Sequence, residues 1–118
     1  MPSGFIDDGY TIDATIRGKE RQYDSIVITY RPLLRREMWH HSQSVASAKE
    51  KQDLEKIDEL VAELLDNKLA SWTLKDRSGE IVPITKENLL RLHTDLFTEI
   101  MLVVLRSSDK DNSTAKNS

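Results

Sequence analysis

Residues 10–30 alternate between apolar and polar side chains on both sides of a polar turn, and this pattern constrains the fold more than any other feature of the chain. One face of the first half would carry Tyr10, Ile12, Ala14 and Ile16, and one face of the second half Ile26, Ile28 and Tyr30. The polar residues 17–22 between them include Gly18, which can adopt a positive φ. We therefore predict an N-terminal β-hairpin, which Pro32 ends because proline has no N–H to donate to a ladder.

The segment from Leu33 to Lys68 contains neither glycine nor proline and is rich in helix-forming residues, so it is predicted to be helical. In its second half, apolar side chains recur at three- and four-residue spacing and require a packing partner. This stripe comprises Leu54, Ile57, Val61, Leu64 and Leu65. Residues 41–48 are small and polar, and they fit a weak helical turn, a close helix-packing site or a flexible connection equally well. The pattern leaves open whether residues 33–68 form one helix or two.

Residues 71–84 have the pattern of a short second hairpin, with a strand at 71–74, a turn at 76–79 and a second extended piece. Thr85 can then cap a C-terminal helix that is expected to run to about Arg106. The apolar residues of this helix are too widely spread for a single stripe, which indicates burial on more than one side and a surface for an oligomer or a partner. They are Leu89, Leu92, Leu96, Phe97, Ile100, Met101, Val103 and Val104.

Length and composition predict one α+β domain over residues 1–106, because 118 residues with 38% hydrophobic side chains suit a single core. Residues 107–118 are almost entirely polar and are predicted to form a disordered tail. Neither a signal-peptide pattern nor an apolar run long enough for a bilayer occurs, so no membrane association and a cytoplasmic location are expected. The absence of cysteine excludes disulfides, thiolate metal sites and cysteine nucleophiles.

The sequence contains no grouped residues of the kind that catalysis requires, so we predict a protein that is not an enzyme and uses no cofactor. The four glycines are scattered and form no phosphate-binding loop. Adjacent His40 and His41 would point about 100° apart on a helix, which argues against a shared metal ion. The competing enzyme hypothesis requires a pocket with convergent titratable groups around His93 or His40.

One basic cluster stands out, formed by Arg31, Arg35 and Arg36 and followed by Trp39 and the two histidines. Arginine and aromatic side chains together can bind phosphates and stack on bases, which makes a small regulatory nucleic-acid-binding protein the alternative function. The net charge of −3 gives no global attraction to a polyanion and disfavours nucleic acid as a partner. Because Glu37 interrupts the cluster and the rest of the chain is acidic, the pattern favours a helix N-terminus that is simply solvated. The cluster equally suits an acidic protein surface.

Three stretches carry a resemblance to a known family: Ile28-Thr29-Tyr30-Arg31-Pro32, Ser71-Trp72-Thr73-Leu74-Lys75-Asp76, and the run from Gly79 through Ile81-Val82-Pro83-Ile84-Thr85 to Leu89. Over residues 26–105 the chain resembles the small tail assembly chaperones of long-tailed bacteriophages and prophages. The resemblance implies a non-enzymatic cytoplasmic protein that binds the tape-measure protein and keeps its long helices from aggregating.

The candidate partner-binding residues are the two tryptophans and apolar members of the C-terminal helix, because aromatic side chains are enriched at binding hot spots. They are Trp39, Trp72, Leu96, Phe97, Ile100 and Val104. Trp72 fits a place in the core equally well. The expected assembly is a homo-oligomer or a complex with a helical protein, with the nucleic-acid alternative resting on Arg31, Arg35 and Arg36.

Overall fold

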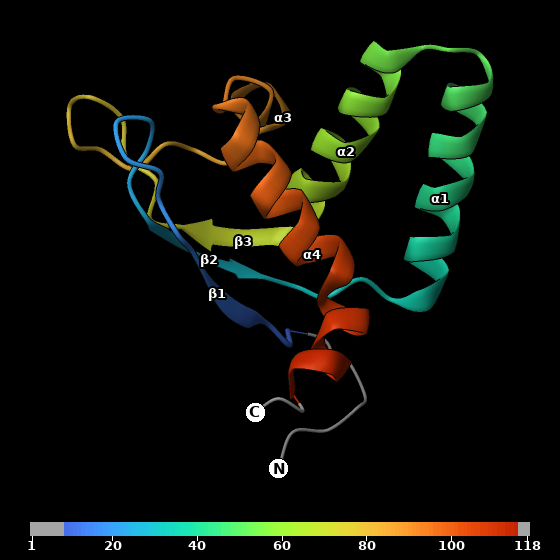
Figure 1. Cartoon of the computed structure of the whole chain (residues 1–118), viewed down its shortest axis with the longest axis horizontal. Coiled ribbons are helices and arrows are strands. Elements are labelled where there is room, and N and C mark those ends of the chain that lie inside the picture. Colours follow the sequence, from blue (N-terminus) through green and yellow to red (C-terminus); the bar gives the residue numbers. More distant parts are fainter. Residues whose placement is uncertain (1–8, 116–118) are drawn as a thin grey trace.

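The computed structural model describes residues 9–115, with side chains described as far as residue 105. The fold is α+β, as predicted, with a three-stranded antiparallel sheet of order β1-β2-β3 and four helices in the described part of the chain (Figure 1). The strands are β1 (Ile12–Ile16), β2 (Ile26–Tyr30) and β3 (Leu69–Trp72). The helices are α1 (Arg35–Glu50), α2 (Leu54–Lys68), α3 (Lys86–Leu89) and α4 (Thr94–Ala115). No helix in this part of the chain is long and apolar enough to cross a bilayer.

The N-terminal hairpin is confirmed, with Ile12 opposite Tyr30 and Ile16 opposite Ile26. Its loop uses Gly18 for a close approach and not for a positive φ. A Cβ atom at Gly18 would lie 2.5 Å from both the Ser25 nitrogen and the Tyr23 oxygen, which no side chain can accommodate. The positive φ of the loop, 67°, occurs at Arg21 instead.

The helical middle forms two antiparallel helices, and the small polar segment 41–48 is an ordinary part of α1. The chain reverses at Gln52, whose φ of 55° places it in the left-handed region that non-glycine residues rarely adopt. Two hydrogen bonds of Asp53 offset that strain. Its N–H donates to the Ala48 carbonyl at 3.0 Å, and its side chain accepts from the Lys56 N–H at 3.1 Å and caps α2.

The second hairpin is present in a short form. Its first arm is β3, which begins and ends two residues before the predicted strand at 71–74. It pairs with β2 so that Trp72 lies opposite Ile28, with a register shift between Thr29 and Tyr30. Beyond β3, the arms are joined by a bridge between Lys75 and Ile81. The hydrogen bond from the Val82 N–H to the Leu74 carbonyl, at 2.9 Å, extends this contact.

Thr85 caps the next helix as predicted, and its hydroxyl accepts from the Asn88 N–H at 3.0 Å. The expected single helix is divided, because α3 ends at Leu89 and α4 begins only at Thr94. At the start of α4 the His93 Nδ1 accepts from the Asp95 N–H at 3.2 Å. Helix α4 continues to Ala115 and so enters the segment 107–118. The side chains there lie outside the described residues, and the disordered tail stays a prediction.

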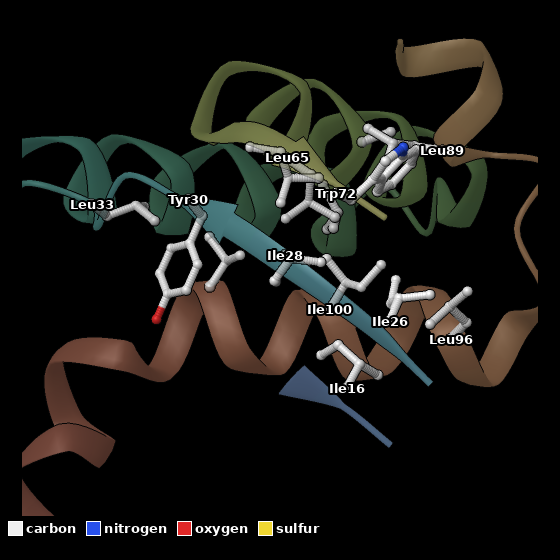
Figure 2. Packing of buried hydrophobic residues seen from close by; sticks show 14 residues of the cluster. Ile16, Ile26, Ile28, Tyr30, Leu33, Leu65, Trp72, Leu89, Leu96 and Ile100 are labelled. Atoms are coloured by element: carbon white, nitrogen blue, oxygen red, sulfur yellow. The ribbon is translucent and has the colours of Figure 1, made fainter. Parts of the chain in front are cut away.

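The core lies between the sheet and the two helices α2 and α4. Figure 2 shows Ile100 of α4 beside Ile28 of β2, with Leu65 of α2 and Trp72 of β3 close by. Figure 1 shows α1 outside this arrangement, beside α2 and away from the sheet. An ion pair of 2.7 Å between Lys19 and Asp95 ties the tip of the first hairpin to the start of α4.

Candidate partner-binding surfaces

An apolar groove opens between the N-terminal half of α2, the bend that joins α3 to α4, and the first turns of α4. It has a volume of about 360 Å³. Its lining is apolar except for Asp58, Thr94 and Thr98. The apolar lining residues are Ile57, Val61, Leu89, Leu90, Leu92, Phe97 and Met101.

The groove exists because the C-terminal helix is broken. If α3 continued straight into α4, the connection from Leu90 to His93 would not form a wall beside α2. Val61 and Leu89 are buried and form the floor, whereas Phe97 and Met101 are only partly buried. Leu90 is 43% exposed on the rim. An open apolar concavity of this kind is a favourable site for an apolar side chain from another molecule.

A second feature is an exposed basic knob on α1, which we define as Trp39 with Arg35 and Arg36. The Trp39 side chain is 57% exposed, an unusual position for an indole, and its ring meets the His40 ring edge-on at a centroid distance of 5.2 Å. Both arginines are exposed one helical turn before Trp39. The knob therefore combines a large apolar side chain with two positive charges.

The knob points away from the body of the protein because α1 turns its other face towards α2. The partly buried Glu37 lies beside that packing face, which is formed by Met38, His41, Val45 and Ala48. Their spacing of three and four residues defines one side of the helix. Trp39 lies on the opposite side of α1, where it is exposed.

A polar cleft of about 540 Å³ lies between α1 and α2, beside Arg31. Within it the nearly buried Lys68 ammonium pairs with the Glu37 carboxylate at 2.6 Å. Burial acts to raise the pKa of Glu37. The hydrogen bond from the Leu34 N–H and the nearby Lys68 charge outweigh this effect, so the pKa of Glu37 is lowered. Burial also lowers the pKa of His41, which favours its neutral form against the cleft wall.

The structure places the six candidate partner-binding residues in two different environments. Trp39 is exposed on the knob and Phe97 lines the groove, so both are available to a partner. The other four candidates, Trp72, Leu96, Ile100 and Val104, are core residues with at most 5% exposure. Trp72 also donates its indole N–H to the Val82 carbonyl at 2.7 Å, which fixes it inside the protein.

The three arginines of the nucleic-acid alternative are all exposed near the N-terminal end of α1. Together with Lys68 and Glu37 they carry four positive charges and one negative charge, although the whole chain has a net charge of −3. Because the Lys68 charge is paired with Glu37, the local excess of positive charge comes from the three arginines.

Of the apolar groove residues, only Phe97 was predicted to bind a partner, and Leu90 was not singled out at all. Residues such as Ile57 and Met101 were predicted only as members of two separate apolar surfaces. The groove residues come from three separate segments, and only the fold brings them together. Two signals in the sequence pointed to the groove: the apolar stripe of residues 54–65, which supplies Ile57 and Val61, and the wide apolar surface of the C-terminal helix, which divides into a core face and a groove face.

The competing enzyme hypothesis requires a pocket in which titratable groups converge around His93 or His40. The polar cleft does gather titratable groups around His40, namely His41, Glu63 and the paired Glu37 and Lys68. Glu63 forms its ion pair with Lys86. Across residues 9–105 no group of three or more histidine, aspartate or glutamate side chains is placed to hold a metal ion. Comparison of the chain with protein-family models, with curated proteins and with solved structures finds no match.

Proposed function

We propose that this protein is a non-enzymatic adaptor or assembly chaperone that binds an amphipathic helix of another protein in the apolar groove. The observation that carries the proposal is the groove itself, an open concavity with seven apolar lining residues and a single charged one. The resemblance of residues 26–105 to phage tail assembly chaperones identifies the tape-measure protein as the partner to test first. Such a protein would act in the cytoplasm, where tails are assembled.

The groove suits a helix because its walls are themselves formed by helices α2 and α4 and by the bend before α4. A partner helix that places apolar side chains at positions i, i+3, i+4 and i+7 would bury them against Phe97 and Met101. The unbranched Met101 side chain can adapt to different partners. Asp58 on the groove edge would favour a partner with a basic residue beside its apolar stripe.

A co-expression experiment tests this proposal. The full chain is produced together with the tape-measure protein from the same genome, and the soluble fraction of the tape-measure protein is measured. Leu90→Glu places a charge on the groove rim, and we expect it to reduce that fraction severely. Ile81→Glu is the matched control, because Ile81 is 51% exposed and lies outside the groove.

The control should behave like the unmodified chain. If neither variant changes the solubility, the groove is not the binding site. If the unmodified chain itself neither binds nor protects the tape-measure protein, that partner is wrong.

Nucleic acid remains the second candidate ligand, and the exposure of Trp39 beside Arg35 and Arg36 is the observation that favours it. Guanidinium groups would contact phosphates and the indole would stack on a base. Binding to single-stranded oligonucleotides should then fall steeply with added salt and disappear when Arg31, Arg35 and Arg36 are replaced by alanine. The absence of binding at low salt would eliminate this function.

A further inference from the structure

We infer that copies of this chain associate head to tail, with the basic knob of one copy seated in the apolar groove of the next. The two features are complementary in size, polarity and charge, and both are open to solvent within residues 9–105. The inference concerns the free protein and does not depend on the identity of any other partner.

The knob and the groove match in size and polarity. The groove of about 360 Å³ is of the order that accepts a large side chain, and its walls are apolar. Trp39 is 57% exposed, and an indole that leaves water for such a groove is a typical binding hot spot. Phe97 on the groove wall offers a second aromatic ring to contact it.

The knob and the groove also match in charge. Arg35 and Arg36 flank Trp39 on the knob, whereas Asp58 is the only charged residue that lines the groove. Glu55 lies one turn before Asp58 on the exposed side of α2. Docking of the knob would therefore bring the two guanidinium groups towards the carboxylates of Asp58 and Glu55.

The two features cannot meet within one molecule. Figure 1 shows α1 on one flank of α2 and α4 on the other. Trp39 is exposed on α1, whereas the groove is lined by residues of α2, of the bend before α4 and of α4 itself. A contact between different surfaces is heterologous, so it closes into a ring or continues as a chain of copies. Self-association and the binding of a partner helix would compete for the same groove, so the association would shield its apolar surface until a partner arrives.

Sedimentation analysis of the purified full chain over a range of concentrations tests the inference. The unmodified protein should grow beyond a dimer as concentration rises. Trp39→Ala and Leu90→Glu should each weaken association at least about 30-fold, the effect of losing a hot spot. Ile81→Glu should associate like the unmodified protein, and circular dichroism verifies that each variant is folded.

Mixing the variants gives the decisive result. The Trp39→Ala copy retains an intact groove and the Leu90→Glu copy retains an intact knob, so an equimolar mixture should form a one-to-one dimer that neither forms alone. A charge reversal provides a second check: Arg35→Glu with Arg36→Glu should weaken association, and Asp58→Lys in the same chain should restore part of it.

An unmodified protein that stays monomeric at every concentration overturns the inference. So does a mixture of the two variants that remains monomeric. An unmodified protein that stops at a dimer overturns the head-to-tail arrangement. None of these outcomes bears on helix binding, which the co-expression experiment tests separately.

Discussion

Helices α1 and α4 are both long, but they are held in the fold in opposite ways. Helix α4 contributes the fully buried Leu96, Ile100 and Val104 to the core, whereas α1 buries only Ala48. Helix α1 packs chiefly against α2, while α4 contacts both α2 and β1. The difference separates a helix that stabilises the fold from one that displays side chains.

The same difference explains where candidate function lies. An element held by many buried contacts offers little to a partner on its core face, and α4 contributes to the groove only through its second face. An element held by one neighbour leaves most of its circumference in solvent, and α1 accordingly presents Trp39 and two arginines. The following predictions test this division, from the largest expected effect to the smallest.

The largest effect is expected from Ile100→Ala in α4. Ile100 is fully buried, and truncation of such a side chain removes apolar contacts and leaves a cavity, so the free energy of unfolding should fall by about 2–5 kcal/mol. Val45→Ala, on the partly buried face of α1, should cost about 1 kcal/mol or less. Chemical denaturation of both variants measures the two losses. Equal losses would show that α1 is as deeply integrated as α4.

Glu37→Ala should have the next largest effect, because Glu37 both accepts from the Leu34 N–H at 2.8 Å at the start of α1 and neutralises the nearly buried Lys68. The loss of a helix-end hydrogen bond suggests a cost of about 1 kcal/mol, since the carboxylate is partly exposed and screened by water. Glu63→Ala is the control, because its ion pair with Lys86 is on the surface and should matter less. Chemical denaturation at pH 7 measures the loss in the free energy of unfolding for each variant. Equal losses would contradict the role assigned to the pairing of Glu37 with Lys68.

A smaller and pH-dependent effect is expected from His41. Because burial lowers the pKa of His41, the unfolded chain binds a proton more readily than the folded chain. The free energy of unfolding should therefore decrease as the pH falls below about 6.5, the ordinary histidine value, towards the lowered pKa. His41→Gln should flatten this decrease, whereas the same change at exposed His40 should not. Unfolding curves between pH 7.5 and about pH 5 measure the slope, and identical slopes for all three proteins would contradict the prediction.

The smallest effect on stability is expected from Trp39→Ala. A side chain that is 57% exposed and not part of the core should change the free energy of unfolding by about 0.5 kcal/mol or less. The measurement is made at a concentration where the protein is monomeric. A loss comparable to that of Ile100→Ala would show that Trp39 supports the monomer and would remove the reason to regard it as a contact residue.

Local patterns predicted the elements, and contacts between distant segments decided the rest. Alternation was sufficient for the first hairpin because the period of two is a property of each strand alone. The break between α1 and α2 was not predictable in the same way, because no glycine or proline marks it. Gln52 adopts a left-handed backbone conformation, and the two hydrogen bonds of Asp53 offset its strain. Similarly, the pairing of Trp72 with Ile28 depends on β3 reaching β2 across two helices.

The candidate site was predicted in part for a related reason. The wide apolar surface of the C-terminal helix indicated two buried sides, but spacing alone cannot tell which side faces the core. Leu96 and Phe97 are neighbours in sequence, yet one lies in the core and the other lines the groove. Trp39 and Trp72 were equivalent candidates by residue type. Only the fold distinguishes them, because Trp72 belongs to a strand of the sheet and is buried, whereas Trp39 is exposed on α1.

The ion pair between Lys19 and Asp95 joins residues that lie 76 positions apart in the chain. During synthesis, the first hairpin therefore emerges long before the helix that covers its apolar face, while α1 and α2 can pair as soon as both have been made. Formation of the core must await α4, and such long-range closure is slow compared with helix pairing. Until then the nascent chain exposes the apolar face of the hairpin and is itself vulnerable to aggregation.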